Sequence, residues 1–368
     1  MKKKLVSVLM CMAMGATLLA GCGSEEAADS SNTTAADAAD ADTAADSEAA
    51  DASDAADAAD AADGDVITIG FAQVGHESDW RTASTNSAQS IFSAENGYDL
   101  QFVDCDQDSA VQLEAVRGFI EQDVDYIIID PIVSTGWDTV LTECEEAGIP
   151  VIVIDRTIDD SDKYISWVGS NFKNEGLAAG EWLKAYTDAK GISDVNVLVI
   201  EGTTGASAQI GRTDGFKEIA DANGWNILDS QTGDFTQAGG QEVMESYIKS
   251  YEGQFNVVVC QNDNEAFGAM DALLERQYRI PGDISVVGCD NTLFSRFHTI
   301  GLTTVEHFVD QKGRDACDII LRKIESQKSY RKGDEPTSIY HIEYEPRLIV
   351  RGSTGYAPDE SHREKKKK

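Results

Sequence analysis

The stretch V-I-V-I-D-R at positions 151–156 decides how this chain folds. Four consecutive β-branched apolar residues without polar alternation are typical of a strand buried on both faces of a parallel sheet. The run ends abruptly in an acid and a base, Asp155 and Arg156. In an open α/β sheet the carboxyl ends of the strands face the ligand crevice. The charged pair therefore either begins a loop or is directed at a ligand.

Other segments repeat this pattern of an apolar run that closes on polar side chains. They lie at 101–104, 126–130, 196–201, 256–263 and 284–290. Because parallel strands end at the same edge of a sheet, six such endings predict one polar rim.

Strands and helices alternate along the chain in two successive series. The expected strands lie at 66–72, 100–104, 126–129 and 151–154, then at 195–200, 227–230, 257–260, 284–287, 302–305, 339–344 and 347–350. Helices are expected between them, one of them after a capping box of Ser109 and Gln112. The alternation predicts doubly wound parallel sheets in two lobes, with a cleft where small ligands commonly bind.

Length and composition limit the partners that this chain can have. Its 368 residues allow two modest lobes or one large one. A net charge of −35 argues against nucleic acid or an anionic membrane surface as the partner. Seven cysteines without a CxxC motif or metal-ligand spacing predict free buried thiols.

The N-terminus reads as an export signal. Lys2, Lys3 and Lys4 precede an apolar stretch that is too short to span a membrane. The ending L-A-G-C at 19–22 resembles a bacterial lipobox, which implies lipidation of Cys22; the alternative is an ordinary signal peptide with a chance cysteine. Residues 23–64 are rich in alanine and aspartate and predict a solvated linker, and 355–368 predict a charged tail.

Several short motifs follow one another in a distinctive order. They are I-G-F-A-Q-V-G-H-E-S-D-W-R (69–81), V-I-V-I-D-R (151–156), G-A-S-A-Q-I-G-R-T-D-G-F (205–216), S-Q-T-G-D-F-T (230–236), Q-N-D (261–263) and V-V-G-C-D (286–290). Together they resemble the type I periplasmic sugar-binding proteins of ABC importers, most closely the galactofuranose-binding branch and next the ribose-binding proteins. The resemblance implies two lobes joined by a hinge of three chain crossings.

The C-terminal motifs are similar to a different group. L-T-T-V-E-H-F (302–308), G-R-D-A-C-D-I-I-L (313–321) and P-R-L-I-V-R-G-S-T (346–354) look like the effector domain of LacI-type repressors, which shares this fold. By resemblance, the N-terminal lobe comprises 66–169 plus 307–334. The C-terminal lobe comprises 170–306 plus 335–354.

The resemblance also implies a sugar site in the cleft. A sugar pocket needs aromatic surface for the ring and fixed donors and acceptors for the hydroxyls. The implied sugar-binding residues are Ser78, Trp80, Arg81, Asp155, Arg156, Arg212, Phe235, Asn262, Asp290 and His307. The alternative role is ordinary core packing for Trp80 and Phe235. For Asp155, Arg156 and Arg212 it is a surface ion pair. His307 stands where the family usually has Gln, and it either contacts the ligand or faces the hinge.

Paired acids also suggest a glycosidase, which needs two carboxylates flanking the scissile bond. Asp155 and Asp290 could form such a pair, but neighbouring arginines would keep both ionised and leave no proton donor. The chain has no GxSxG, HExxH or P-loop motif and no calcium loop. We therefore expect no enzyme activity, no cofactor and no metal.

These observations predict an extracytoplasmic lipoprotein that captures a monosaccharide and delivers it to the subunits of an ABC permease. We expect a monomer that does not bind nucleic acid and that touches the membrane through its lipid anchor alone. Two alternatives remain: a sugar sensor for a histidine kinase or chemoreceptor, and an autonomous signal or adhesion domain.

Overall fold

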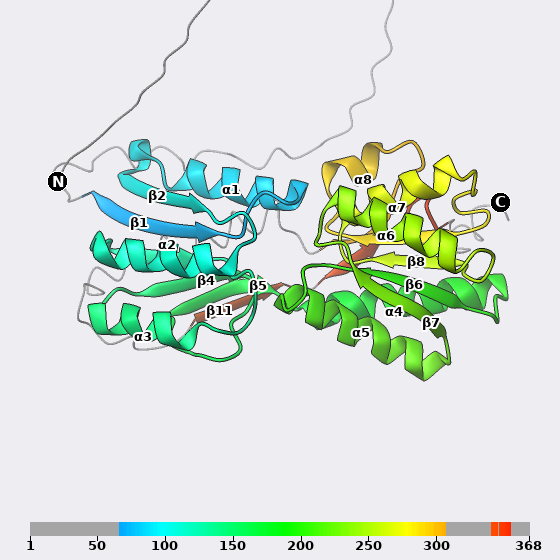
Figure 1. Cartoon of the computed structure of the whole chain (residues 1–368), viewed down its shortest axis with the longest axis horizontal. Coiled ribbons are helices and arrows are strands. Elements are labelled where there is room, and N and C mark those ends of the chain that lie inside the picture. The colour runs from blue at the N-terminus through cyan, green and yellow to red at the C-terminus, as the bar shows by residue number, and fades with distance from the viewer. Residues whose placement is uncertain (1–65, 307–339, 345, 355–368) are drawn as a thin grey trace, which may run out of the picture. The chain divides into compact units, whose positions relative to one another are not determined.

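A computed structural model of the chain describes residues 66–306, 340–344 and 346–354. These residues form two six-stranded sheets with helices packed against them (Figure 1). The expected α/β class, with parallel strands in two lobes, is confirmed.

The first sheet has the strand order β11-β5-β4-β3-β1-β2, and all its neighbouring strands are parallel. Its strands are β1 (Ile67–Gln73), β2 (Tyr98–Asp104), β3 (Tyr126–Ile129), β4 (Val151–Asp155), β5 (Ser166–Ser170) and β11 (Tyr340–Tyr344). Its helices are α1 (Asp79–Ile91), α2 (Ser109–Glu121) and α3 (Asp138–Ala147), with a short 3-10 turn η1 (Ala94–Asn96).

Strand β4 is apolar throughout because both of its faces are covered. Ile152 and Ile154 pack in the cluster on the α1 side of the sheet. Val151 and Val153 pack on the opposite side, with the residues of α2 and α3. A strand with core on both sides cannot alternate polar and apolar residues, which explains the unbroken run in the sequence.

The second sheet has the order β12-β10-β9-β8-β6-β7, and only the pair of β10 and β12 is antiparallel among the described strands. Its strands are β6 (Asn196–Glu201), β7 (Asn226–Thr232), β8 (Val257–Cys260), β9 (Ser285–Cys289), β10 (Thr303–Glu306) and β12 (Arg347–Ile349). Its helices are α4 (Phe172–Lys190), α5 (Ser207–Asn223), α6 (Gln237–Ser250), α7 (Asp263–Glu275) and the short α8 (Leu293–Phe297).

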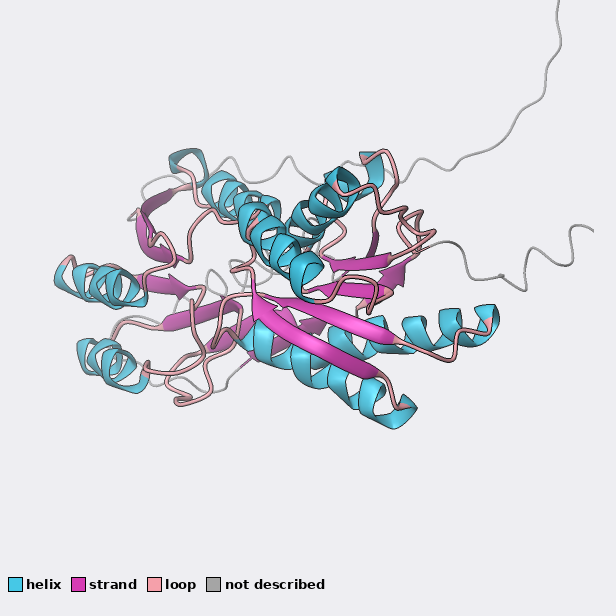
Figure 2. Cartoon of the chain, turned by 45° about the vertical axis from the view of Figure 1, so that its right-hand side comes forward, coloured by secondary structure: helices cyan, strands magenta, loops and turns pink. Residues whose placement is uncertain are grey.

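Two helix pairs sandwich the second sheet (Figure 2). Leu198 and Ile200 of β6 face the pair of α6 and α7. Val197 and Val199 of the same strand face the pair of α4 and α5. The sheet therefore has a separate hydrophobic cluster on each side.

Strand β11 corrects one part of the expected lobe division. We expected residues 335–354 in the C-terminal lobe, but β11 lies beside β5 in the first sheet, and only β12 joins the second. The pattern of apolar runs also did not predict β5, S-W-V-G-S, which has serine at both ends. Strands of both lobes have the same kind of apolar sequence. The local sequence of a strand near the C-terminus, such as β11, therefore cannot show which of the two sheets it joins.

The expected capping box of Ser109 and Gln112 is wrong. Asp108 is the N-cap, and its carboxylate accepts hydrogen bonds from two backbone N–H groups of the first turn. The buried Gln112 side chain instead donates to the carbonyl of Asp130 (2.6 Å) and accepts from the N–H of Ile132 (2.9 Å). The Gln112 side chain therefore binds the backbone after β3 and does not cap the helix.

Four cysteines lie in the described part of the chain, Cys105, Cys144, Cys260 and Cys289, and all are buried and free. None of the helices described is both long and apolar enough to cross a bilayer. The predicted signal peptide with Cys22, the linker 23–64, the segment 307–334 with His307, and the tail 355–368 lie outside the described residues.

Candidate functional site

Side chains from both sheets surround one small cavity. Its lining residues are Glu77, Ser78, Trp80, Arg81, Asp155, Arg156, Ala208, Arg212, Phe235, Asn262 and Asp290. Nine of the ten residues expected from the sequence are among them, and the tenth, His307, lies outside the described residues. The free space is about 20 Å³, which is enough for one water molecule.

The ends of strands and the starts of helices bring these side chains together. Asp155 is the last residue of β4, and Asp290 directly follows β9. Ser78 and Asn262 are the N-caps of α1 and α7. Phe235 lies in the turn between β7 and α6. The polar rim predicted from the strand endings is therefore present.

Three of these residues have left-handed backbone conformations. The φ angles are 57° at Asp155, 62° at Phe235 and 122° at Asp290. Residues with a β-carbon rarely adopt this region, and such conformations cluster at functional sites. The strain shows that the surrounding fold holds these three side chains in place.

Arg81 is the centre of a buried ion network in the first lobe. Its guanidinium pairs with Asp130, with Glu77 (3.1 Å) and with Asp155 (3.2 Å). Burial alone would lower the pKa of Arg81, but the charges of Asp130, Glu77 and Asp155 raise it. Burial also raises the pKa of Asp130, against the charge of Arg81. Arg81 therefore remains a cation beside the cavity.

Arg156 lies beside this network and reaches the other lobe. Its Nη1 donates to the carbonyl of Ile132 (2.9 Å), and its Nη2 lies 3.8 Å from Glu77. Its guanidinium carbon lies 5.2 Å from the centre of the Phe235 ring, a cation–π distance. Burial and the charge of Arg81 lower the pKa of Arg156.

Glu77 is a lining residue that the sequence interpretation missed. Its side chain is 2 % exposed, and its Oε2 makes no hydrogen bond. Burial favours the protonated acid, but the charges of Arg81 and Arg156 outweigh it and lower the pKa of Glu77. Glu77 precedes Ser78, the N-cap of α1, so its pairing with Arg81 four residues later joins the chain before the helix to the first turn. Glu77 thus adds a third carboxylate to the lining of the cavity.

Arg212 has the corresponding position in the second lobe. Its Nε donates to Glu175 (2.7 Å) and its Nη1 to the carbonyl of Gln261 (2.7 Å). Its Nη2 lies 3.9 Å from the Asp290 carboxylate, and its guanidinium carbon 5.8 Å from the Phe235 ring centre. The Phe235 ring is therefore within cation–π distance of a guanidinium group from each lobe.

A close contact between α4 and α5 positions Arg212 against Glu175. A β-carbon added at Gly215 would lie 2.1 Å from the carbonyl oxygen of Lys173, and one at Gly176 2.3 Å from that of Arg212. Only glycine permits this approach of two backbones. The contact sets the distance between the two charges.

The Asn262 side chain, which the sequence indicated as a ligand contact, also makes two hydrogen bonds within the protein. Its Oδ1 accepts from the Glu265 N–H (2.7 Å), and its Nδ2 donates to the Phe235 carbonyl (2.8 Å). Since an amide nitrogen carries two hydrogens, one N–H remains for a ligand. Asn262 thus holds the Phe235 turn in place.

Asp263 holds the chain that follows Asp290. Its carboxylate accepts from the N–H of Thr292 (2.8 Å) and from the hydroxyl of Thr304 (2.5 Å). Burial and the charge of Asp290 raise its pKa to about 8. The loop with Asp290 is thereby tied to both α7 and β10.

Hydrogen bonds join the two lobes around the cavity. The N–H of Asp79 donates to Asn264 (3.2 Å), and that of Thr157 to the hydroxyl of Ser207 (2.8 Å). The two lobes are therefore in direct contact in the described residues.

Glu265 gives the stability of the fold a pH dependence of defined sign. Burial raises its pKa to about 8, although the N–H groups of Phe235 and Asn262 donate to its carboxylate. The folded protein therefore keeps a proton that the unfolded chain releases above its ordinary pKa of 4.5. This contribution is fully present below that pH and is lost as the pH rises to about 8. We expect the wild-type melting temperature to fall more steeply than that of Glu265→Gln between about pH 5 and pH 8.

Differential scanning fluorimetry across this range measures the two slopes. Glu275→Gln, which changes an exposed acid of the same helix, is the matched control and should follow the wild type. Parallel curves for Glu265→Gln and the wild type would contradict the assignment.

Comparison with known proteins places the chain in a family. The model of the periplasmic binding protein domain matches residues 69–310. The chain belongs to this family. The resemblance seen in the sequence motifs is thereby confirmed.

Relatives of this periplasmic binding protein include proteins named for furanose sugars. It is 42 % identical over 223 residues to the galactofuranose-binding protein YtfQ of Escherichia coli (strain K12), which covers 59 % of this chain and 69 % of that protein. The arabinose ABC transporter component of Shewanella sp. ANA-3, bound to α- and β-L-arabinofuranose, is 35 % identical with a TM-score of 0.67, covering 82 % of this chain and 97 % of that chain. A Mycobacterium smegmatis structure in complex with β-D-fucofuranose is 36 % identical with a TM-score of 0.69, covering 81 % and 96 %.

The cavity of this periplasmic binding protein is suited to holding a polar ligand. Guanidinium groups supply fixed donors, carboxylates supply acceptors, and aromatic rings lie beside both. Within the described residues, His, Cys, Asp and Glu do not gather into a group of three that could hold a metal ion.

Proposed function

We propose that this periplasmic binding protein captures a monosaccharide in the cavity between its lobes and delivers it to an ABC permease. The sugar is galactofuranose-like or a related pentose or hexose. One observation carries the proposal: a single cavity is lined from both lobes by three arginines, three acids and two aromatic residues.

The charge balance of the cavity favours a neutral ligand with many hydroxyl groups. Arg81, Arg156 and Arg212 are each close to a carboxylate, so their charges are largely offset. A sugar hydroxyl can accept from a guanidinium and donate to a carboxylate at once. The carboxylate of Glu77, which lines the cavity, is one acceptor for such a hydroxyl.

The aromatic residues supply a surface for the sugar ring. Trp80 stands at the start of α1 in one lobe, and Phe235 in the other. The weakly polarised C–H bonds of a sugar ring pack well against aromatic faces. The furanose ligands in the names of three relatives support a five-membered ring.

Capture requires the lobes to move. A free space of about 20 Å³ holds one water molecule and no sugar, so entry requires the two lobes to separate. A sugar that contacts both lobes favours the closed arrangement over the open one. The closed form then presents itself to the permease.

The remaining features of the proposal concern location and partners. Export and lipidation at Cys22 would place the protein outside the cell membrane, with residues 23–64 as a spacer. We propose that it acts as a monomer, touches the membrane only through the lipid, and has no catalytic role.

Isothermal titration over a panel of free pentoses and hexoses, including arabinose, ribose, galactose and fucose, tests the ligand class. We expect at least one sugar to bind with a Kd of about 1 µM, which corresponds to about −8 kcal/mol. Flat titrations for the whole panel would refute sugar capture. The permease is tested separately, because retrieval of a histidine kinase instead of a permease by the sugar-bound protein would indicate signalling.

A further inference from the structure

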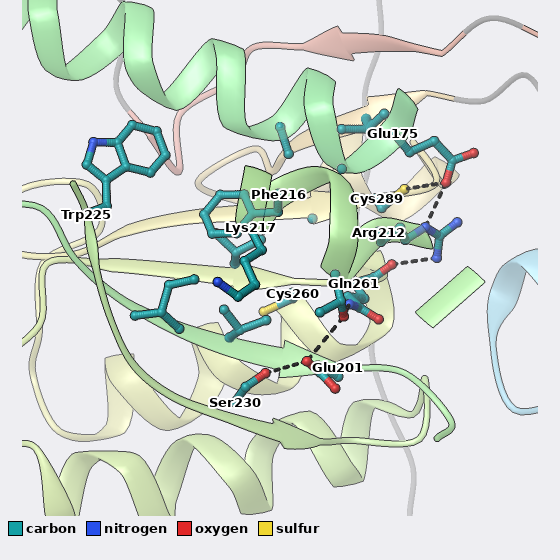
Figure 3. A pocket seen from close by; sticks show the side chains of 18 of the residues that line it. Glu175, Glu201, Arg212, Phe216, Lys217, Trp225, Ser230, Cys260, Gln261 and Cys289 are labelled. Atoms are coloured by element: carbon teal, nitrogen blue, oxygen red, sulfur yellow. Dashed lines mark hydrogen bonds and ion pairs between the residues drawn. The ribbon is translucent and has the colours of Figure 1, made fainter. Parts of the chain in front are cut away.

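A second, larger cavity lies within the second lobe, between the sheet and the helices α4 and α5 (Figure 3). Its volume is about 500 Å³. Protein interiors are close-packed, and voids larger than a few water molecules are rare. Cavities of 300–1,000 Å³ with mostly apolar walls are the usual size of small-molecule sites.

The walls of this cavity are largely apolar. Valines 199 and 259 line it from the sheet, with Phe216 from α5 and Ile227 from β7. The rings of Phe216 and Trp225 lie 6.0 Å apart at an angle of 39° and form an aromatic corner. A flat apolar body would fit against this corner better than a hydroxylated sugar ring.

One side of the cavity is polar and has spare acceptor capacity. The Glu201 carboxylate accepts from Ser230 (2.5 Å), as Figure 3 shows. It also accepts from Gln209 (2.8 Å) and Thr213 (3.2 Å). A carboxylate can accept about four hydrogen bonds, so one position remains for a donor from a ligand.

The two cationic side chains that line this cavity are each paired with an acid. Lys217 pairs with Asp221 (2.5 Å) at the exposed rim, and Arg212 pairs with Glu175 (2.7 Å) at the opposite end. An anionic ligand would have to displace the acid of one of these pairs. An uncharged ligand fits the site without disturbing them.

We propose that this cavity binds an uncharged, mainly aromatic small molecule with one hydrogen-bond donor, of the phenol or indole class. Its ring lies against Phe216 and Trp225, and its O–H or N–H group donates to Glu201. The site shares the side chain of Arg212 with the cavity between the lobes and no other lining residue. The proposal does not depend on sugar binding.

Fluorine NMR of 5-fluorotryptophan-labelled protein tests the proposal with 1-naphthol as the probe. The chain has five tryptophans, so each resonance can be assigned with one Trp→Phe variant. We expect 1-naphthol to shift the Trp225 resonance in a saturable manner and to leave Trp80 unchanged. A shift at Trp80, or no saturable shift at Trp225, would overturn the proposal.

Two filling variants, Val199→Phe and Ala179→Phe, test whether the space itself is responsible. Both residues line the cavity, so an added ring should enter it, preserve the melting temperature and abolish the naphthol shift. Val197→Phe is the matched control: Val197 lies on the same face of β6 but does not line the cavity, so this variant should be overpacked and melt at a lower temperature.

The proposal fails if the melting temperatures of both filling variants are as low as that of Val197→Phe, because the protein then has no cavity at this position that could hold the added ring. It also fails if either folded filling variant still binds 1-naphthol. Sugar affinity, measured in parallel, should not change in the folded filling variants.

Discussion

Arg212→Met should reduce the affinity for the sugar about 100-fold or more, the expected loss for two hydrogen bonds from a charged donor. Methionine keeps much of the side-chain length but removes every donor. The substitution should also destabilise the fold by about 3–5 kcal/mol, since it removes the cation that pairs with the buried carboxylate of Glu175. Titration calorimetry and thermal melting measure the two effects.

The double variant Arg212→Met/Glu175→Gln separates binding from folding. Removing the unpaired charge should recover most of the lost stability, whereas binding should remain as weak as in the single variant. A stable double variant with wild-type sugar affinity would show that Arg212 only holds the helix in place. The result would also remove the cavity between the lobes as the sugar site.

Gly215→Ala should be among the most destabilising single-methyl substitutions in the described part of the protein. The new β-carbon would lie 2.1 Å from the backbone carbonyl of Lys173, so α4 and α5 would have to separate. We expect a loss of about 3 kcal/mol, equivalent to a melting temperature about 10 °C lower. Sugar affinity should fall as well, because α5 carries Arg212.

Gly118→Ala in α2 is the matched control for Gly215→Ala. A β-carbon at Gly118 would have only the end of the Gln122 side chain nearby, at 4.0 Å. In an open helical position alanine is more stable than glycine by about 1 kcal/mol, so this variant should melt slightly higher. If both variants melt alike, the close contact of α4 and α5 does not exist in solution.

Most strands could be predicted from the sequence because a strand that is buried on both faces has an unbroken run of apolar residues. Both faces of β4 are covered, so V-I-V-I needs no polar residue, and the same holds for the V-V-V of β8. Strand β5 has no such apolar run, since only tryptophan and valine among its five residues are strongly apolar. Strand β11 joins the first sheet by pairing with β5. Because β5 itself was not predicted, the sheet that β11 joins could not be predicted either.

The site residues could be predicted as a set but their interactions could not. Strand endings and family motifs indicated Asp155, Asp290 and the arginines, because parallel strands end at one edge. They did not indicate that Arg81 pairs with Asp130, 49 positions away. Ion pairs depend on distances of a few ångströms, and two positions so far apart in the chain take such distances only from the fold.

By itself, the sequence determined the fold class, the polar rim and the family, because burial periodicity and short motifs are local properties of the chain. Only the tertiary structure decided the partner of each charge, the place of β11, the role of Glu77 and the cavity beneath α5. Each of these depends on how closely two separate elements pack, and packing distances are set by the whole fold and not by any one segment.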